Sequence, residues 1–354
     1  MTNLLPVIAV AVLAFLWFRN RRSGASDASA PVKQSARSVE LGLLPLDQLD
    51  EHHAARPVPE LTGALKAARN GSWQPAADLL AATGTDWDRR SSYAYSLGEA
   101  AAKGDGWLVA WEKARPDDPD AAVVRARGTV ILAWRQRGGQ WAAQTSSEQF
   151  DAFHTTLARS QEEIARAAEL NPRDPTPYVT EIWTGIGLGY PHEEMRRLWT
   201  ELTALAPNHY AAHYSALQYW CAKWRGSDEL AREFAARAAA GAPPGSLMSA
   251  FPLIAWYEAL LKDSAETPDH RNPEMTALVD AALIDAAAAP ADHPHLAELR
   301  HLLAHFLSEQ GRYDAALEQF RLVDGYVEAL PWRYYGDARL AYTAAREKAV
   351  RKAG

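Results

Sequence analysis

Apolar residues recur every three or four positions through most of the chain, with polar and charged residues between them. This spacing puts the apolar side chains on one face of a helix, whereas a half-buried strand needs strict alternation. Alanine is frequent and runs of Val, Ile and Thr are rare, which also favours helix over strand. We therefore expect an all-α protein. The pattern predicts helices over residues 59–70, 73–82, 87–103, 105–115, 119–136, 148–170, 175–186, 191–205, 209–223, 228–240, 247–262, 274–289, 295–310, 312–324 and 333–352.

An aliphatic residue is followed five positions later by proline at three places, Ala167–Pro172, Leu202–Pro207 and Ala238–Pro243. The prolines are 207 − 172 = 35 and 243 − 207 = 36 residues apart, and each interval holds two amphipathic helices. A period in the mid-thirties is typical of a helical-hairpin solenoid, in which neighbouring hairpins must stack to bury their apolar faces. The pattern predicts such a solenoid over residues 56–354, closed by the helix at 333–352.

Near the carboxyl end, aliphatic, small and aromatic residues and a turn glycine follow one another in a fixed order at Leu303, Ala304, Leu307, Gly311, Arg312, Tyr313, Ala316 and Phe320. This stretch resembles the tetratricopeptide repeat (TPR) family. Ala167–Pro172 also looks like the closing signature of that repeat, and the similarity extends over roughly residues 56–330. No copy has the opening Trp, and loops at residues 135–147 and 263–273 break the register, so the resemblance implies a divergent array with two insertions. Residues 191–244 also resemble an uncharacterised family of bacterial TPR-like proteins of unknown function, which implies no activity.

The amino terminus is predicted to anchor the chain in a membrane. Residues 1–18 carry no charged side chain, and Arg19, Arg21 and Arg22 follow at once. As a helix this stretch would be about 27 Å long, close to the thickness of a bilayer core. The alternative, a cleaved signal peptide, would have its positive charges before the apolar run. The charges favour an uncleaved single-pass anchor with the following domain in the cytoplasm.

Residues 19–55 are predicted to be a flexible linker. Residues 23–38 are rich in Ser and Ala and lack apolar periodicity, which is typical of a tether. Within the linker, the apolar stretch Leu41–Leu46 is a candidate for docking on the helical domain.

Composition excludes some classes of function. The formal net charge of −7 argues against a nucleic-acid-binding protein, which needs a basic face for the phosphates. The single cysteine, Cys221, excludes an intrachain disulfide and is expected to be a buried thiol. Thirteen tryptophans are an unusually large number, and most are expected to fill the core between hairpins.

Histidines provide the candidate metal ligands. His301 and His305 are four residues apart on a predicted helix, with His293, His295 and Glu298 upstream, and histidines at this spacing can share a zinc ion. No glutamate follows His301 directly, so the metalloprotease motif is absent. We expect these residues, and the pair His209 and His213, to have structural roles.

A second group of motifs is also expected to be structural. The glycines at residues 185–189 are expected to end a helix, because a dinucleotide-binding loop would follow a strand. No Gly-x-Ser-x-Gly elbow for a nucleophilic serine is present.

The function predicted from the sequence is that of a membrane-anchored scaffold without enzymatic activity or cofactor. In repeats of this kind the first helix of each hairpin faces a concave groove, and aromatic residues with polar tips suit the binding of a protein or peptide. Two alternatives remain open: a metal-dependent hydrolase using residues 293–305, and a self-associating structural protein. The residues predicted to face the groove are Trp183, Tyr214, Gln218, Ile254 and Tyr257.

Overall fold

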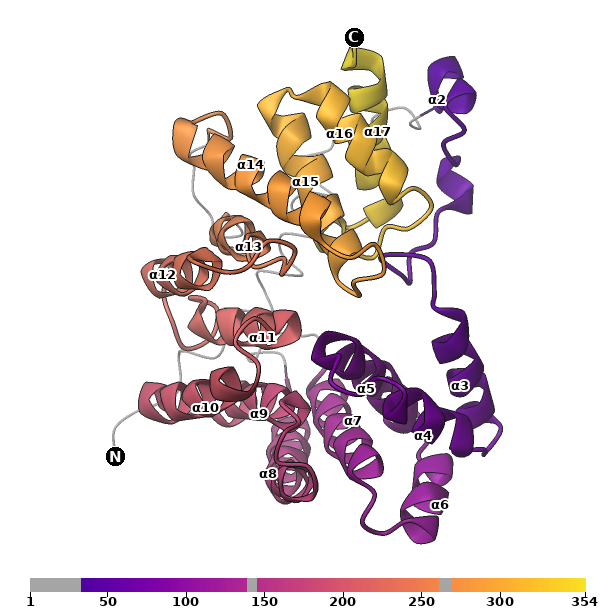
Figure 1. Cartoon of the computed structure of the whole chain (residues 1–354), viewed down its shortest axis with the longest axis vertical. Helices are drawn as coiled ribbons and strands as arrows, with labels where there is room; N and C mark the ends of the chain where they lie inside the picture. Colours follow the sequence, from indigo (N-terminus) through magenta and orange to yellow (C-terminus); the bar gives the residue numbers. More distant parts are fainter. Residues whose placement is uncertain (1–32, 139–144, 261–268) are drawn as a thin grey trace. The chain divides into compact units, whose positions relative to one another are not determined.

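The computed structural model describes residues 33–138, 145–260 and 269–354, and over these ranges the protein is all-helical (Figure 1). The described residues contain no β-strand, only an isolated parallel bridge between Asp50 and Tyr326. The chain forms two compact units. Within the described ranges, unit 1 is Pro57–Ala231, and unit 2 combines residues 33–56 with Arg232–Gly354.

Unit 1 is a series of antiparallel helical hairpins. In each of the first four hairpins the two helices pack against each other, and each first helix also packs against the first helix of the next hairpin. This double contact buries the apolar face of every hairpin against its neighbour. The helices are α3 (Pro59–Arg69), α4 (Gln74–Ala81), α5 (Trp87–Ala101), α6 (Gly106–Ala114), α7 (Pro119–Arg137), α8 (Ser147–Leu170), α9 (Thr176–Leu188), α10 (His192–Leu205) and α11 (Tyr210–Trp220). The boundary with unit 2 falls in α12 (Asp228–Ala239).

Glycines set the close approach of α5 and α7. A Cβ atom at Gly98 would lie 2.9 Å from Cγ of Arg127 and 3.1 Å from the backbone nitrogen of Gly128. A Cβ atom at Gly128 would in turn lie 3.2 Å from Cβ of Ala101. Since the two backbones nearly touch here, any larger residue must push the helices apart.

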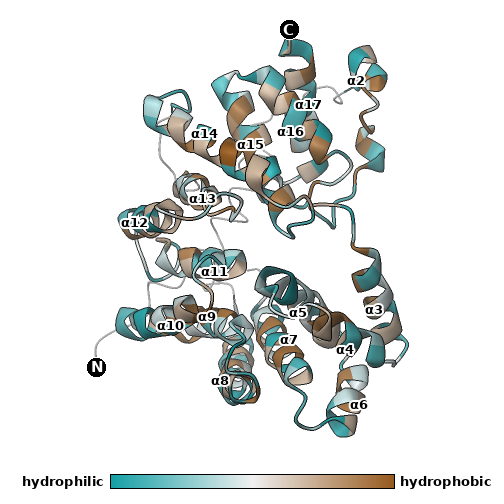
Figure 2. Cartoon of the chain, viewed as in Figure 1, coloured by the Kyte–Doolittle hydropathy of each residue, from teal (hydrophilic) through white to brown (hydrophobic). Residues whose placement is uncertain are grey.

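Unit 2 continues with helices that pack on their neighbours in sequence, and α13 packs on α15 and α15 on α17. Figure 2 shows hydrophobic and hydrophilic residues together on most helices, as expected for amphipathic helices packed on a shared core. The elements are α2 (Ala36–Glu40), η1 (Leu46–Gln48), α13 (Ala250–Ala259), α14 (Pro273–Ala288), α15 (Leu296–Gln310), α16 (Tyr313–Leu322), η3 (Trp332–Tyr334) and α17 (Ala338–Lys352).

Residues 34–54, the N-terminal strap, lie along the carboxyl-terminal helices of unit 2. The sequence predicts a linker over residues 19–55, but over residues 34–54 the structure instead has α2, η1 and a chain held by hydrogen bonds. Leu44 N donates to Asp324 Oδ2 (2.7 Å), and Leu44 O accepts from Arg346 Nη2 (2.7 Å). Leu43 and Leu49 are buried, so part of the predicted docking stretch Leu41–Leu46 is part of the core.

The predicted helix at 333–352 is interrupted in the structure. The 3-10 helix η3 comes first, and α17 begins only after Asp337, whose side chain accepts from Leu340 N at 2.8 Å. An aspartate that caps a helix start sets where the helix begins, and apolar periodicity alone does not reveal it. The other predicted helices agree with the structure to within a few residues, and Gly189 ends α9 in the left-handed conformation.

None of the helices in the described ranges is long and apolar enough to cross a membrane. The predicted anchor at residues 1–18 lies outside the described residues.

Candidate functional site

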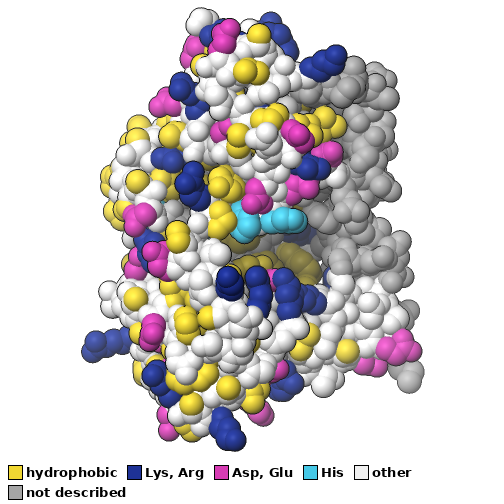
Figure 3. All heavy atoms as spheres, turned by 90° about the vertical axis from the view of Figure 1, so that its right-hand side faces the viewer, with side chains coloured by type: hydrophobic (Ala, Val, Ile, Leu, Met, Phe, Trp, Pro, Cys, Tyr) yellow, Lys and Arg dark blue, Asp and Glu magenta, His cyan; other side chains and the backbone are white. Residues whose placement is uncertain are grey.

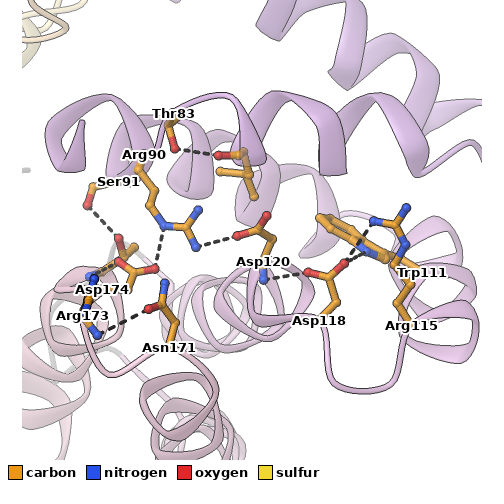
Figure 4. Close-up of polar contacts among 12 residues, drawn as sticks. Thr83, Arg90, Ser91, Trp111, Arg115, Asp118, Asp120, Asn171, Arg173 and Asp174 are labelled. Atoms are coloured by element: carbon orange, nitrogen blue, oxygen red, sulfur yellow. Dashed lines mark hydrogen bonds and ion pairs between the residues drawn. The ribbon is translucent and has the colours of Figure 1, made fainter. Parts of the chain in front are cut away.

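The amino-terminal ends of α5, α7 and α9 meet at a buried arginine (Figure 4). Arg90 Nε donates to Asp174 Oδ2 at 2.6 Å, and Arg90 Nη2 lies 2.6 Å from Asp120 Oδ1. The side chains of Arg90 and Asp174 are 4% and 0% exposed. Burial disfavours the charge on Arg90, but the carboxylates of Asp174 and Asp120 raise its pKa. The guanidinium therefore stays charged and joins three helix starts.

A serine, a histidine and an aspartate lie beside this arginine. Ser91 Oγ is 2.9 Å from His209 Nε2, and Asp88 Oδ1 is 3.8 Å from His209 Nδ1. The same residue types form the nucleophile, base and orienting acid of serine hydrolases. In such a triad Nδ1 carries the proton and Nε2 accepts from the serine, so the tautomer decides whether this group could act.

The backbone at the start of α11 fixes the opposite tautomer. Ala212 N donates to His209 Nδ1 at 3.0 Å, so Nδ1 is the unprotonated nitrogen of the neutral ring. Nε2 then carries the hydrogen, which it donates toward Ser91 Oγ or toward Trp87 O at 3.1 Å. A nitrogen that donates cannot take the serine proton. His209 therefore caps α11, and the group is structural.

We define the polar junction as Asp88, Arg90, Ser91, Asp120, Asp174, Thr176 and His209. Tyr210 N donates to Asp88 Oδ1 at 2.9 Å, and Ser91 Oγ is 3.3 Å from Thr176 Oγ1. Through these contacts the first helix α5 packs directly, at this end, against the first helices α9 and α11 as well as against α7, the first helix of the next hairpin.

Further along the same helices, partly exposed aromatic residues gather. We define the tryptophan cluster as Trp134 near the end of α7, Trp183 in the second half of α9, and Trp224 just after α11. The Trp134 ring lies edge-on to Trp183 and Trp224, with centroids 6.1 and 5.4 Å apart. It also contacts the buried Phe153 ring of α8 at 5.0 Å. All three tryptophans remain partly exposed, so the cluster is both a packed unit and a surface.

Polar groups accompany the cluster. Trp183 Nε1 donates to Ser215 Oγ at 2.9 Å, whereas no described residue accepts from Trp134 Nε1. The Arg137 guanidinium lies 5.7 Å from the Trp134 ring centroid, and burial lowers its pKa. Its Nη1 donates to Gly138 O at 3.3 Å, and no carboxylate of the described residues pairs with it. Trp134 Nε1 and the Arg137 guanidinium are buried, so the cluster offers a partner its aromatic ring surface.

The five residues predicted to face the groove have different environments. Trp183 and Tyr214, on α9 and α11, are partly exposed. Gln218 in unit 1 and Ile254 and Tyr257 in unit 2 are 3%, 1% and 1% exposed, so they belong to the core and offer no surface to a partner. Their position in the repeat predicted exposure to a groove, but first helices also pack against one another, which buries these three side chains.

Trp134 was not among the predicted residues. It stands at the border of the loop at residues 135–147 that breaks the repeat register, and an alignment of repeats does not assign a face there. Trp224, just after α11, was not among the predicted residues either. A tryptophan near the carboxyl end of consecutive first helices is the signal that could have found the cluster.

The histidines of unit 2 are part of an aromatic core. His301 Nδ1 accepts from Trp332 Nε1 at 3.1 Å, and Nε2 donates to Ala54 O at 3.0 Å. Burial lowers the pKa of His301 to about 4, so its ring is neutral. Both nitrogens are therefore engaged, and neither offers a lone pair to zinc in this arrangement.

The neighbouring histidines do not complete a metal site with it. The His305 ring lies between aromatic rings, 5.8 Å from Tyr257 and 5.9 Å from Trp332 by centroid. His293 and His295 contact each other before α15. In the described ranges no three His, Cys, Asp or Glu side chains are grouped to hold a metal ion.

Comparison with protein-family models, with curated proteins and with solved structures gives no match.

Proposed function

We propose that this protein is a membrane-anchored, TPR-like scaffold that binds a protein or peptide partner at the tryptophan cluster of unit 1. The observation that carries the proposal is the cluster itself: three partly exposed tryptophans from successive hairpins in one packed group. Tryptophan is the residue type most enriched among binding hot spots, because a large rigid ring gains contact area at little cost in entropy.

The hairpin architecture supports this function. First helices that pack side by side present a row of equivalent positions, and repeat proteins use such rows as extended binding surfaces. At one end of these helices the hydrogen bonds of the polar junction hold the helices together. The tryptophan cluster, further along the same helices, is the aromatic surface proposed for binding. Of the residues predicted from the sequence, Trp183 is in the cluster and Tyr214 is on the neighbouring first helix α11.

The proposed membrane anchor contributes to partner binding by raising the local concentration of the partner. A partner in or near the same membrane meets a tethered scaffold at a raised effective concentration, which strengthens binding without additional contacts. The charge asymmetry of residues 1–22 favours the cytoplasmic side for both units. A carboxyl-terminal reporter that works only outside the cytoplasm should stay silent, and a bright reporter would reverse the proposed orientation.

The partner site is tested with Trp183→Ala/Trp224→Ala in the full chain. Proximity labelling should give a small partner set for the native chain that the double variant loses. For a purified partner, affinity should fall at least about 30-fold, since hot-spot residues contribute about 2 kcal/mol or more. Trp73→Ala is the matched control, because Trp73 is also partly exposed in unit 1 and stacks on Trp111 at 5.8 Å, outside the cluster.

Folding of each variant is checked by circular dichroism and urea unfolding. If the folded double variant keeps the native partner set and affinity, as the Trp73→Ala control should, the tryptophan cluster is not the binding site. A mass that rises with concentration in the native chain, and is unchanged by partner, would favour the self-association alternative.

A further inference from the structure

One end of unit 2 collects cations from two segments that are far apart in sequence. We define the cationic end as Lys33 and Arg37 of the amino-terminal segment together with Lys348, Arg351 and Lys352 of α17. Lys33, Arg37, Arg351 and Lys352 are exposed, and Lys348 is partly exposed. The spacing 348, 351 and 352 puts the α17 cations on one helix face.

Two hydrogen bonds bring the segments together. Arg37 Nη1 donates to Ala353 O at 2.9 Å, and Ser35 N donates to Glu347 Oε2 at 3.1 Å. The partial negative charge at the end of α17 accounts for cations on that helix. It does not account for Lys33 and Arg37, which come from a different segment and add their charge to the same end.

The acidic residues nearby leave a positive excess. Glu40 of α2 is exposed, whereas Glu347 is 5% exposed and already engaged with Ser35. Lys348 Nζ is 3.6 Å from Glu309, which offsets one cation. The whole chain has a formal net charge of −7, so a local excess of this sign is not an average property of the surface.

The exposed surface of α2 is also partly apolar. Val39 is 61% exposed, one of the most exposed large apolar side chains of the described residues. Figure 3 looks onto the side of unit 2 that carries α2 and shows Lys and Arg side chains, with some acidic ones, toward the end of unit 2 where Figure 1 has α2 and the end of α17.

We infer that the cationic end of unit 2 rests on the anionic phospholipids of a membrane leaflet. The inference rests on the proposed anchor, and only the 14 residues 19–32 separate Phe18 from Lys33. Fourteen residues span at most about 50 Å, so α2 is never far from the bilayer surface. The cytoplasmic leaflet carries the anionic lipids, which is the side that the anchor charges favour.

The lipid contact is tested in the full chain, reconstituted in vesicles of phosphatidylcholine alone or with about 30% phosphatidylserine. A fluorophore on Ala36→Cys in α2 reports its distance from quencher lipids labelled at the headgroup. The chain without that substitution measures any labelling of Cys221, which is buried. Quenching should be stronger with phosphatidylserine and should fall in 0.5 M salt, since salt screens exposed charges.

The charge variant Lys33→Gln/Arg351→Gln/Lys352→Gln should lose the additional quenching. Each cation near an anionic surface contributes about fivefold to the ratio of surface-bound to free orientations, so three contribute about 100-fold. The matched control, Lys66→Gln/Arg69→Gln/Arg173→Gln, removes the same charge from exposed residues of unit 1 and should keep it. Quenching that is equal in the two vesicles, or equal in both variants, would overturn the inference.

Extraction with alkaline carbonate separates this inference from the anchor. A chain removed from the vesicles by carbonate would overturn the anchor and the lipid contact with it. A chain that resists extraction but is quenched equally with and without phosphatidylserine would overturn the lipid contact alone. Partner binding at the tryptophan cluster is measured separately, so its failure would not be confused with either result.

Discussion

Units 1 and 2 each use a buried arginine to hold segments together, but the segments differ in how far apart they lie along the chain. Arg90 joins helix starts within unit 1, and its longest bond spans 84 residues, to Asp174. Arg346 of unit 2 is 0% exposed and bonds to Asp324 at 2.5 Å and to Leu44 O, 302 residues away. A buried arginine thus joins neighbouring hairpins in unit 1, whereas in unit 2 it binds a segment that is distant in the sequence, the N-terminal strap.

The difference shows two ways to finish a helical array. Unit 1 holds its hairpins through capping residues that the hairpins themselves supply, as in the polar junction. Unit 2 covers its carboxyl-terminal helices with the N-terminal strap, which also buries Leu43 and Leu49. An apolar helix face that no other hairpin packs against needs such a cover.

The largest expected effect comes from removing the buried arginine of unit 1. Arg90→Met leaves Asp174 buried without its ionic partner, which should lower the free energy of unfolding by about 3–5 kcal/mol. Urea unfolding measures the loss. Hydrogen exchange should show reduced protection in α5 and α9, with α15 and α17 unchanged.

Arg346→Met is the corresponding change in unit 2. It should reduce protection in the N-terminal strap and α17 while α5 and α9 keep theirs. If either variant loosens both units equally, the two arginines do not act within separate units, and the comparison fails.

Acid should loosen both units through one histidine each. Burial lowers the pKa of His213 in unit 1 and of His301 in unit 2 to about 4, against about 6.5 when unfolded. The unfolded chain therefore binds protons first as the pH falls, so stability is lost between pH 6.5 and 4. Each histidine should account for about 1.4 kcal/mol per pH unit and about 3 kcal/mol in total.

The measurement is urea unfolding from pH 7 to 4.5, with hydrogen exchange to separate the units. His213→Gln should flatten the pH dependence of unit 1 only, and His301→Gln that of unit 2 only. Unchanged pH dependence in both variants would mean that other groups carry the acid sensitivity.

The smallest effect concerns the helix crossing of unit 1. Gly98→Ala places a methyl group against Arg127 and the backbone of Gly128, and forcing α5 from α7 should cost about 1–3 kcal/mol. Gly63→Ala in α3 is the matched control, because nothing lies within 4 Å of its added Cβ and alanine favours a helix interior. It should stabilise unit 1 by about 0.5–1 kcal/mol. Equal effects of the two changes on urea unfolding would show that the crossing is not tightly packed.

The helices could be predicted from the sequence because their signals are local. Apolar periodicity located them, and short-range contacts fix their ends, as where the Asp118 side chain at the start of α7 accepts from Asp120 N. The N-terminal strap could not be predicted as ordered, because its order depends on partners such as Asp324 and Arg346 about 300 residues away. The apolar stretch Leu41–Leu46 indicated docking, but nothing in it identifies these two partners.

The candidate site was only partly predictable for a related reason. Trp183 was recognised because its repeat is regular. Trp134 was missed because it borders a loop that breaks the register. Gln218 and Tyr257 were assigned to a groove by their position in the repeat, but burial depends on how neighbouring first helices meet, which a repeat period does not determine.

The N-terminal strap also has a consequence for biosynthesis. Unit 1 is one continuous stretch and has all its partners once residue 231 is made, whereas the strap must wait for α17. About 300 residues separate Leu44 from Arg346, and at about 5–20 residues per second their synthesis takes about 15–60 s. During that time Leu43 and Leu49 lack the core that finally covers them. On the ribosome, unit 1 would thus be folded while the apolar residues of the N-terminal strap are still exposed. The strap is therefore the segment on which a chaperone would act.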